Sequence, residues 1–224
     1  MRAYVKNSAP ELLLSWQIGG RPWEDFAHDA GAYMPVKAAL RAEQQHLCCY
    51  CEAKLGDDHI EHFCPRHGLH GNASRMFDYA NLGCSCNGGT DRNRHCGHYK
   101  AQQYDPRQFV TPCTEDSGKL FAYTVDGGIG SVPGLEAAEQ ARVTYMIRTL
   151  NLDCPRLANM RRSHAHTLQD AIQGMIDADA VDQIDDLALA YLTSDNEGRL
   201  QPFFSLSRQL FGMRAEVVLG LLER

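Results

Sequence analysis

Cysteine and histidine are concentrated in one short part of the chain. Seven of the nine cysteines and six of the ten histidines fall between residues 48 and 98 of the 224. Glycine, proline and asparagine are frequent in the same stretch, and no long periodic apolar segment runs through it. A loop-rich segment of this kind needs a bound metal or disulfide bonds to keep one shape.

A bound metal explains the cluster better than disulfides do. No apolar run long enough to span a membrane exists, and the N-terminus lacks an apolar stretch with a cleavage site, so we expect a cytoplasmic protein. Disulfides are rare in that compartment. The clustering disfavours isolated buried thiols, and a redox C-x-x-C motif opens a helix after a strand, whereas this one follows a predicted helix.

Cys48 and Cys51 form a C-x-x-C pair. This spacing lets two thiolates bind one tetrahedral Zn²⁺ at ~2.3 Å from each sulfur. A second pair of ligands must come from further along the chain. The candidates are Cys84, Cys86 and Cys96, with His95 and His98 as possible substitutes.

Outside the cluster the sequence pattern is mainly helical. Apolar spacing predicts helices over residues 9–16, 36–47, 136–152, 156–176, 181–192 and 203–222, a strand over residues 1–6, and a turn or linker at 127–130 and 133–134. We therefore expect an α+β protein in three parts that form one compact unit. The parts are an N-terminal strand and helix segment (1–46), a metal-bound core (47–110), and a linker with a C-terminal helical region (111–224).

The charge of the chain is unevenly distributed. The net charge of −6 argues against tight binding of a polyanion by the chain alone. Residues 60–107 nevertheless hold six Lys or Arg against four acids, whereas residues 168–198 hold eight acids and no Lys or Arg. The basic centre is therefore the part of the chain that suits phosphate groups.

Three motifs follow one another within the cysteine-rich region. An acid directly precedes a histidine in HIEHFCP (residues 59–65), Asn81-Leu82 leads towards the second cysteine pair, and CGHYK (residues 96–100) closes the region. This order resembles that of HNH endonucleases. Further similarity, over about residues 1–165, is to the nuclease subunit of Septu-type anti-phage defence systems, which also occurs with some retrons.

The resemblance implies a ββα-metal finger stapled by one structural zinc and flanked by N- and C-terminal helices. It implies a metal-dependent endonuclease that hydrolyses nucleic-acid phosphodiesters and leaves 5′-phosphate and 3′-hydroxyl ends. It also implies a partner, an ABC/SMC-like ATPase that regulates the nuclease. The zinc ligands that match the family are Cys48, Cys51, Cys86 and Cys96, with Cys84 as the rival of Cys86.

The resemblance also implies roles for individual residues. His62 matches the general base, and Glu61 matches a ligand of the catalytic metal. Asn81 matches the middle Asn, which braces the loop between the two strands. His98 matches a second metal ligand, with Asn87 as its rival because of an insertion before Cys96.

Elementary chemistry agrees with these roles. Phosphodiester hydrolysis needs a base of near-neutral pKa, which histidine supplies, and a cation that stabilises developing negative charge. A carboxylate with an imidazole suits Mg²⁺ or Mn²⁺. Arg66, Arg94 or Lys100 can bind flanking phosphates. The remaining histidines of the region are interpreted as ordinary polar loop residues: His59, His67 and His70.

A non-catalytic zinc module, in which the cysteines only shape a docking surface, is the rival interpretation. Such an adaptor has no need for an adjacent acid and histidine, so Glu61-His62 favours the enzyme. The choice between DNA and RNA is left open, because no helix with an evident basic face for reading a groove is present.

Overall fold

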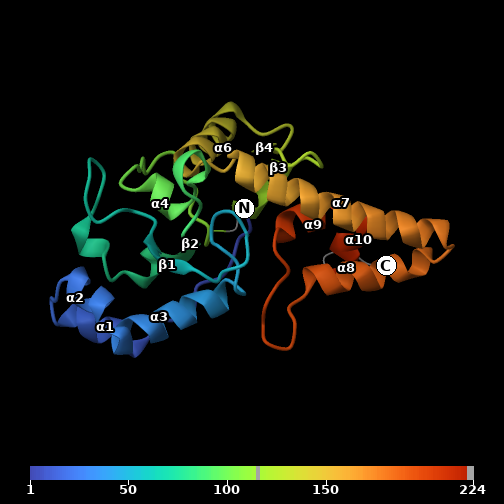
Figure 1. The fold of residues 1–224 in the computed structure, drawn as a ribbon. Coiled ribbons are helices and arrows are strands. Elements are labelled where there is room, and N and C mark those ends of the chain that lie inside the picture. Colours follow the sequence, from blue (N-terminus) through green and yellow to red (C-terminus); the bar gives the residue numbers. More distant parts are fainter. Residues whose placement is uncertain (115–116, 221–224) are drawn as a thin grey trace.

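The chain has an α+β fold in which helices surround two small antiparallel sheets (Figure 1). The structure is a computed structural model that describes residues 1–114 and 117–220. The helices are α1 (Glu11–Ile18), α2 (Trp23–His28), α3 (Ala30–Glu43), α4 (Gly97–Lys100), α5 (Ser117–Leu120), α6 (Ala137–Leu150), α7 (Pro155–Asp177), α8 (Ile184–Leu192), α9 (Phe204–Phe211) and α10 (Met213–Val218). The strands are β1 (Asp58–His62), β2 (Leu82–Cys86), β3 (Phe121–Tyr123) and β4 (Ile129–Ser131). Single 3-10 turns lie at Ala73–Arg75, Tyr79–Asn81, Asp91–Asn93 and Val181–Gln183.

Helix α3 supports the first sheet and delivers the chain to the cysteines. It begins after Asp29, whose side chain accepts a hydrogen bond from the Ala32 amide at 3.1 Å and so caps the helix. Ala32, Val36 and Leu40 recur every four residues and are buried, so one face of α3 enters the core. The predicted helix over residues 36–47 is thus present, but it spans Ala30–Glu43.

Helix α2 is not predicted by the sequence pattern, because its six residues are too few for a helical period to stand out. It buries Trp23 and Phe26, whose ring centroids are 4.9 Å apart. Trp23 also meets the ring of His62 at a centroid distance of 4.3 Å and an interplanar angle of 72°. Helix α2 therefore packs directly on the end of β1.

Strands β1 and β2 form the sheet at the centre of the predicted core. Their antiparallel register pairs Ile60 with Cys84 and His62 with Leu82. The loop of residues 63–81 joins the strands at one end, and the chain beyond β2 leads to the short helix α4. Two antiparallel strands thus precede a short helix, which is the order of elements expected for a ββα-metal finger.

The turn or linker predicted at residues 127–130 belongs to a second hairpin, formed by β3 and β4. Each strand has only three residues, too few for alternation to be recognised in the sequence. The hairpin turn packs against α7, where the buried guanidinium of Arg161 donates a 2.8 Å hydrogen bond to the Gly127 carbonyl.

Helix α7 joins the main core to the C-terminal helices and lies beside them on the right of Figure 1. Leu157 and Ala165 belong to the main core, whereas Leu168 belongs to a second apolar cluster. The buried members of that cluster are Leu47, Leu168, Ile184, Ala188, Leu192, Leu200, Phe204, Phe211 and Ala215. None of the helices in the described ranges is long and apolar enough to cross a membrane.

Two predicted elements differ from the structure. The helix predicted over residues 203–222 is two helices, α9 and α10, because Gly212 adopts φ 55° and ψ −127°, a conformation that interrupts a helix. The last two residues of that prediction lie outside the described ranges. The strand predicted over residues 1–6 is wrong: this segment has one main-chain bond with the rest of the described chain, from the Tyr4 amide to the Pro112 carbonyl, and is otherwise held by side chains such as Arg2, bonded to the Gln44 carbonyl.

Candidate metal centre and catalytic face

The four cysteines predicted as zinc ligands come together in space. The sulfur atoms of Cys48, Cys51, Cys86 and Cys96 all lie within 4.8 Å of one another. The Sγ–Sγ distance is 3.9 Å between Cys48 and Cys96 and 3.7 Å between Cys51 and Cys86. Four sulfurs at ~2.3 Å from a tetrahedral zinc are about 3.8 Å apart. The group therefore fits a metal ion such as zinc.

Each ligand pair is positioned by its own backbone. Cys48 and Cys51 lie in a tight turn in which the Cys48 amide donates to the Ala53 carbonyl at 2.8 Å. Cys86 ends β2, and Cys96 directly precedes α4 with φ 59°. The amide of Cys96 also donates to the Leu150 carbonyl at 2.8 Å, so the cysteine group joins the sheet, α4 and the end of α6.

Cys84, the rival of Cys86, lies outside this group. Its Sγ donates to the Lys37 carbonyl of α3 at 3.5 Å. Burial raises the pKa of this thiol, which suits its role as a neutral donor. His95, a possible substitute ligand, contacts the group from outside, with Nε2 at 3.7 Å from the Cys86 sulfur.

Glu61 is a buried carboxylate held by several neighbours. Its Oε1 lies 2.8 Å from Nζ of Lys100 and accepts a hydrogen bond from the Tyr50 hydroxyl at 3.2 Å. Its Oε2 lies 3.4 Å from Nε2 of His59. Burial alone would raise the pKa of Glu61, but Lys100 and His59 outweigh it and lower the pKa. Glu61 is therefore an anion oriented by two cations or potential cations.

His98 reaches this carboxylate only through His59. The two imidazole rings stack with centroids 4.3 Å apart and an interplanar angle of 6°. Nδ1 of His98 bonds to the Asn87 carbonyl oxygen at 3.0 Å, and Nδ1 of His59 bonds to the side-chain oxygen of Asn87 at 2.8 Å. His59, interpreted above as an ordinary loop residue, thus lies between the predicted ligands Glu61 and His98. Alternation along β1 places His59 on the same face as Glu61, and the end of β2 brings Asn87 beside it.

His62 occupies the opposite face of β1 from Glu61, as strand alternation predicts. Its Nε2 bonds to the Met76 carbonyl oxygen at 2.9 Å. A carbonyl oxygen only accepts, so Nε2 carries the proton and Nδ1 keeps a free lone pair. Burial lowers the pKa of His62 to about 4. The ring is therefore neutral at physiological pH and able to take up a proton.

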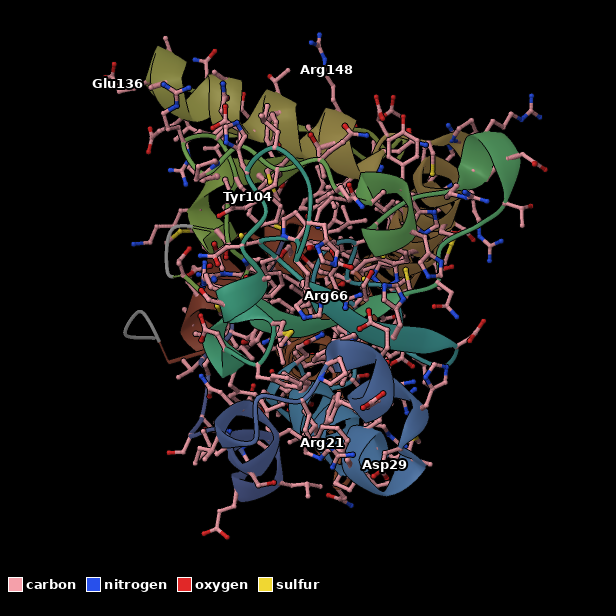
Figure 2. All side chains as sticks on the ribbon, turned by 90° about the vertical axis from the view of Figure 1, so that its left-hand side faces the viewer. Arg21, Asp29, Arg66, Tyr104, Glu136 and Arg148 are labelled. Atoms are coloured by element: carbon pink, nitrogen blue, oxygen red, sulfur yellow. The ribbon has the colours of Figure 1, made fainter. Side chains whose placement is uncertain are left out.

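Both Glu61 and His62 border one small cavity despite pointing to different faces. The cavity has a volume of about 160 Å³ and lies between the end of β1 and the end of α4. Arg66, also in its lining, pairs with Glu24 at 2.5 Å. Figure 2 looks onto this side of the molecule and labels Arg66 near the middle of the face, between the N-terminal helices and α6. The carboxylate of Glu61, the neutral imidazole of His62 and the guanidinium of Arg66 thus line the same cavity.

Asn81 is buried in the loop that joins the two strands. Its Oδ1 accepts from the Cys64 amide at 2.8 Å, and its Nδ2 donates to the carbonyl oxygens of Cys64 at 3.0 Å and Arg75 at 3.2 Å. The Asn81 side chain therefore links the end of the loop to its beginning at Cys64. This position keeps Met76 in place opposite the His62 ring.

The basic side chains of the region differ in their burial and in whether they form ion pairs. Lys100 is 1% exposed and donates to the His62 carbonyl as well as to Glu61, so it is a buried structural cation. Arg94 and Arg156 are exposed around a second cavity of about 530 Å³ that His98 also lines. Neither guanidinium forms an ion pair with any described residue.

No family model matches the chain. Among curated proteins, it is similar to one from Escherichia coli with the name "Retron Ec83 putative HNH endonuclease". The two are 29% identical over 201 residues, in an alignment that covers 72% of this chain and 78% of that protein. The name of this relative agrees with the resemblance to HNH endonucleases that the motifs between residues 59 and 100 carry.

Proposed function

We propose that the protein is a metal-dependent HNH endonuclease that hydrolyses phosphodiester bonds of nucleic acid. One observation carries this proposal above the others. His62 is neutral, its proton is fixed on Nε2 by the Met76 carbonyl, and its free Nδ1 is available beside a cavity that Glu61 shares. A zinc adaptor has no use for a base prepared in this way.

In the proposed reaction His62 takes a proton from the attacking water. The Met76 carbonyl oxygen, already bonded to Nε2, stabilises the imidazolium that forms. Trp23 packs against the ring and limits its rotation. Asn81 keeps the loop that carries Met76 closed. These contacts prepare the base before substrate binds.

Glu61 with a neighbouring imidazole fits a divalent cation such as Mg²⁺ or Mn²⁺. One carboxylate oxygen is held by Lys100, and the other points towards the stacked pair of His59 and His98. Such a cation, when bound, would stabilise negative charge on the scissile phosphate and the departing 3′ oxygen. We propose the separate cysteine group as a structural zinc site that holds β2, α4 and the knuckle of residues 48–51 together.

The nucleic acid in this proposal is held by cationic side chains on either side of the reaction centre. Arg66 borders the small cavity, and Arg94 and Arg156 border the larger one beyond His98. Lys100 is excluded from this role, because it is buried against Glu61. Few phosphates are neutralised by so small a set, which limits the affinity of the chain by itself.

We further propose that the chain acts in a retron-associated or Septu-type defence complex with an ABC/SMC-like ATPase. The C-terminal half of α7 and the following segment through α8 offer a surface for such a partner, since Ile176, Val181 and Leu189 are exposed there. Exposed acids accompany them at Asp170, Asp177, Asp179, Asp182 and Asp186. An acidic surface repels phosphate, so it suits a basic protein surface better than nucleic acid. Cleavage by the isolated chain and by the reconstituted complex should differ strongly in favour of the complex.

The direct test uses zinc-loaded protein with DNA and RNA substrates, single- and double-stranded, in Mn²⁺, Mg²⁺ or EDTA. Internal cleavage that needs the divalent ion and leaves 5′-phosphate ends supports the proposal. Absence of metal-dependent cleavage in both the isolated chain and the complex, with zinc still bound, would favour the adaptor.

A further inference from the structure

His59 and Glu61 face each other, and among the described residues neither Nε2 of His59 nor Oε2 of Glu61 has a partner other than the opposite atom. They are two residues apart on β1 and therefore on the same face of the strand. Nε2 of His59 lies 3.4 Å from Oε2 of Glu61. We propose that these two atoms hold the catalytic divalent cation, so that His59 and not His98 supplies the imidazole ligand. This inference rests on the proposed endonuclease function.

The tautomer of His59 follows from its neighbours. Nδ2 of Asn87 donates to the carboxylate of Asp57 at 2.6 Å, which fixes the orientation of the Asn87 amide. The amide oxygen of Asn87 therefore faces Nδ1 of His59 at 2.8 Å and accepts its proton. In the neutral ring Nε2 then carries a lone pair, and a bound cation would take the place of the proton that Nε2 otherwise shares with Oε2 of Glu61. A carboxylate, amide and imidazole in series are the kind of outer contact that orients a metal-bound histidine.

The spacing of the two atoms fits shared coordination. Two ligands at ~2.1 Å from one ion are about 3.0 Å apart at a right angle and about 3.4 Å apart at a tetrahedral angle. Oε1 of Glu61 is already engaged by Lys100, so Oε2 is the oxygen available to an ion. Both ligand atoms are thus held in place by partners on their far sides.

Gly97, the first residue of α4, closely approaches both proposed ligand atoms. A Cβ at this position would lie 2.5 Å from Oε2 of Glu61 and 2.8 Å from Nε2 of His59. The backbone at position 97 has no positive φ that would require glycine. The close approach of Glu61 and His59 is therefore what excludes a side chain here. An alanine here would occupy the point at which the two ligand atoms converge.

His98 is poorly placed to share the ion with His59. A metal bound to imidazole lies close to the ring plane, because the nitrogen lone pair lies in that plane. The planes of these stacked rings differ by only 6°, so an ion in one plane lies outside the other. His98 acts instead as a positioning residue, whose flat face limits rotation of the His59 ring.

The test measures Mn²⁺ binding to zinc-loaded protein by calorimetry and by electron spin-echo spectroscopy, which detects a bound imidazole nitrogen. His59→Ala should weaken Mn²⁺ binding at least tenfold and abolish the nitrogen signal. Asn87→Ala should weaken binding about 10- to 100-fold through loss of the outer contact. Gly97→Ala should also prevent binding, whereas His98→Phe, which keeps a stacked ring, should retain the nitrogen signal. His70→Ala, at an exposed histidine, is the matched control.

The outcomes separate this inference from the proposed function. If wild type binds Mn²⁺ and cleaves, but the signal survives in His59→Ala and disappears in His98→Phe, the ligand assignment is overturned and the endonuclease stands. If wild type binds no divalent ion beyond its zinc and does not cleave, the proposed function fails as well. Zinc content and circular dichroism show that each variant is folded, and a folded variant of either His59 or Asn87 decides the question.

Discussion

Nε2 of His62 is bonded to the main-chain oxygen of Met76 at 2.9 Å, across the loop that joins β1 and β2. This contact settles which ring nitrogen bears the proton and leaves Nδ1 free. Burial keeps the ring neutral. The base strength, the tautomer and the orientation of the His62 ring therefore all depend on the conformation of the loop of residues 63–81.

His62→Ala should reduce cleavage about 10²- to 10⁴-fold, the usual contribution of a general base. Zinc content should not change, because His62 does not belong to the cysteine group, whereas loss of the contacts with Trp23 and Met76 should lower the melting temperature modestly. His67→Ala, which removes another histidine from the lining of the same cavity, serves as the control. Equal rates in wild type and His62→Ala would remove His62 from the mechanism.

The pH dependence of cleavage should reflect the lowered pKa of His62. The base works only when deprotonated, so its activity is lost as the pH falls through its pKa. Burial places that pKa at about 4, below the ordinary value of 6.5, and a bound cation nearby would lower it further. The rate at saturating Mn²⁺ should therefore stay level from pH 7 to below pH 6. A half-maximal rate near pH 6.5, in protein still folded by circular dichroism, would contradict this.

Lys100 should matter for stability more than for substrate affinity. It is buried against Glu61, and removal of one member of a buried pair costs about 3–5 kcal/mol because the other charge loses its partner. Lys100→Met should therefore lower the free energy of unfolding by about that amount. The double variant Lys100→Met with Glu61→Gln should recover part of the loss. Denaturant unfolding of the four proteins measures the coupling, and a coupling below about 0.5 kcal/mol would refute the buried pair.

Replacement of any zinc ligand should abolish metal binding and most of the fold. A structural zinc contributes about 10–16 kcal/mol to folding, so Cys96→Ser should lose the one zinc per chain and show no cooperative thermal unfolding. Cys84→Ser and Cys49→Ser should keep the zinc, because neither sulfur belongs to the group. Elemental analysis of the purified variants measures this, and zinc loss in Cys84→Ser would mean that the ligand group is wrong.

Chemistry that depends on neighbouring residues in the sequence could be predicted, and chemistry that depends on strand register could not. The C-x-x-C pair and the adjacent Glu61-His62 can be recognised directly in the amino-acid sequence. Cys86 rather than Cys84 is the ligand that the resemblance predicts, and it lies in the cysteine group. The place of His59 depends on the pairing of β1 with β2, which brings Asn87 beside it. Alternation along β1 places His59 on the same face as Glu61, but it does not indicate that Asn87 lies beside it.

Helices were predictable in proportion to their length and regularity. The periodic segments that became α6 and α7 lie close to their predicted bounds, because amphipathic spacing over many residues is a strong signal. The break at Gly212 and the hairpin of β3 and β4 were missed, because a single glycine or a three-residue strand gives little pattern. The buried Lys100 was misjudged because lysine is seldom buried without a partner, and its partner Glu61 lies far away in sequence.

Arg94 and Arg156 should contribute to nucleic-acid affinity without contributing to the chemical step. Both are exposed beside the cavity that His98 lines, and neither is engaged by an acid of residues 1–114 or 117–220. Removal of one phosphate-binding side chain should reduce the slope of log K against log salt by about 0.9 on duplex DNA. Arg94→Ala and Arg156→Ala should each show this reduction, and the double variant should show about twice as much. Cleavage at saturating substrate should stay within about threefold of wild type, because the two arginines lie away from the cavity shared by Glu61 and His62.

Arg148→Ala is the control for this measurement. Arg148 is exposed on α6 and points away from the body of the molecule (Figure 2), so its removal changes the net charge equally but leaves the surroundings of the site intact. An unchanged slope in that variant, beside a reduced slope for Arg94→Ala and Arg156→Ala, would place the nucleic-acid backbone along the second cavity. Equal effects from all three substitutions would show that only net charge matters. The backbone would then have to be held elsewhere, and the exposed arginines of the core would have no specific role in binding.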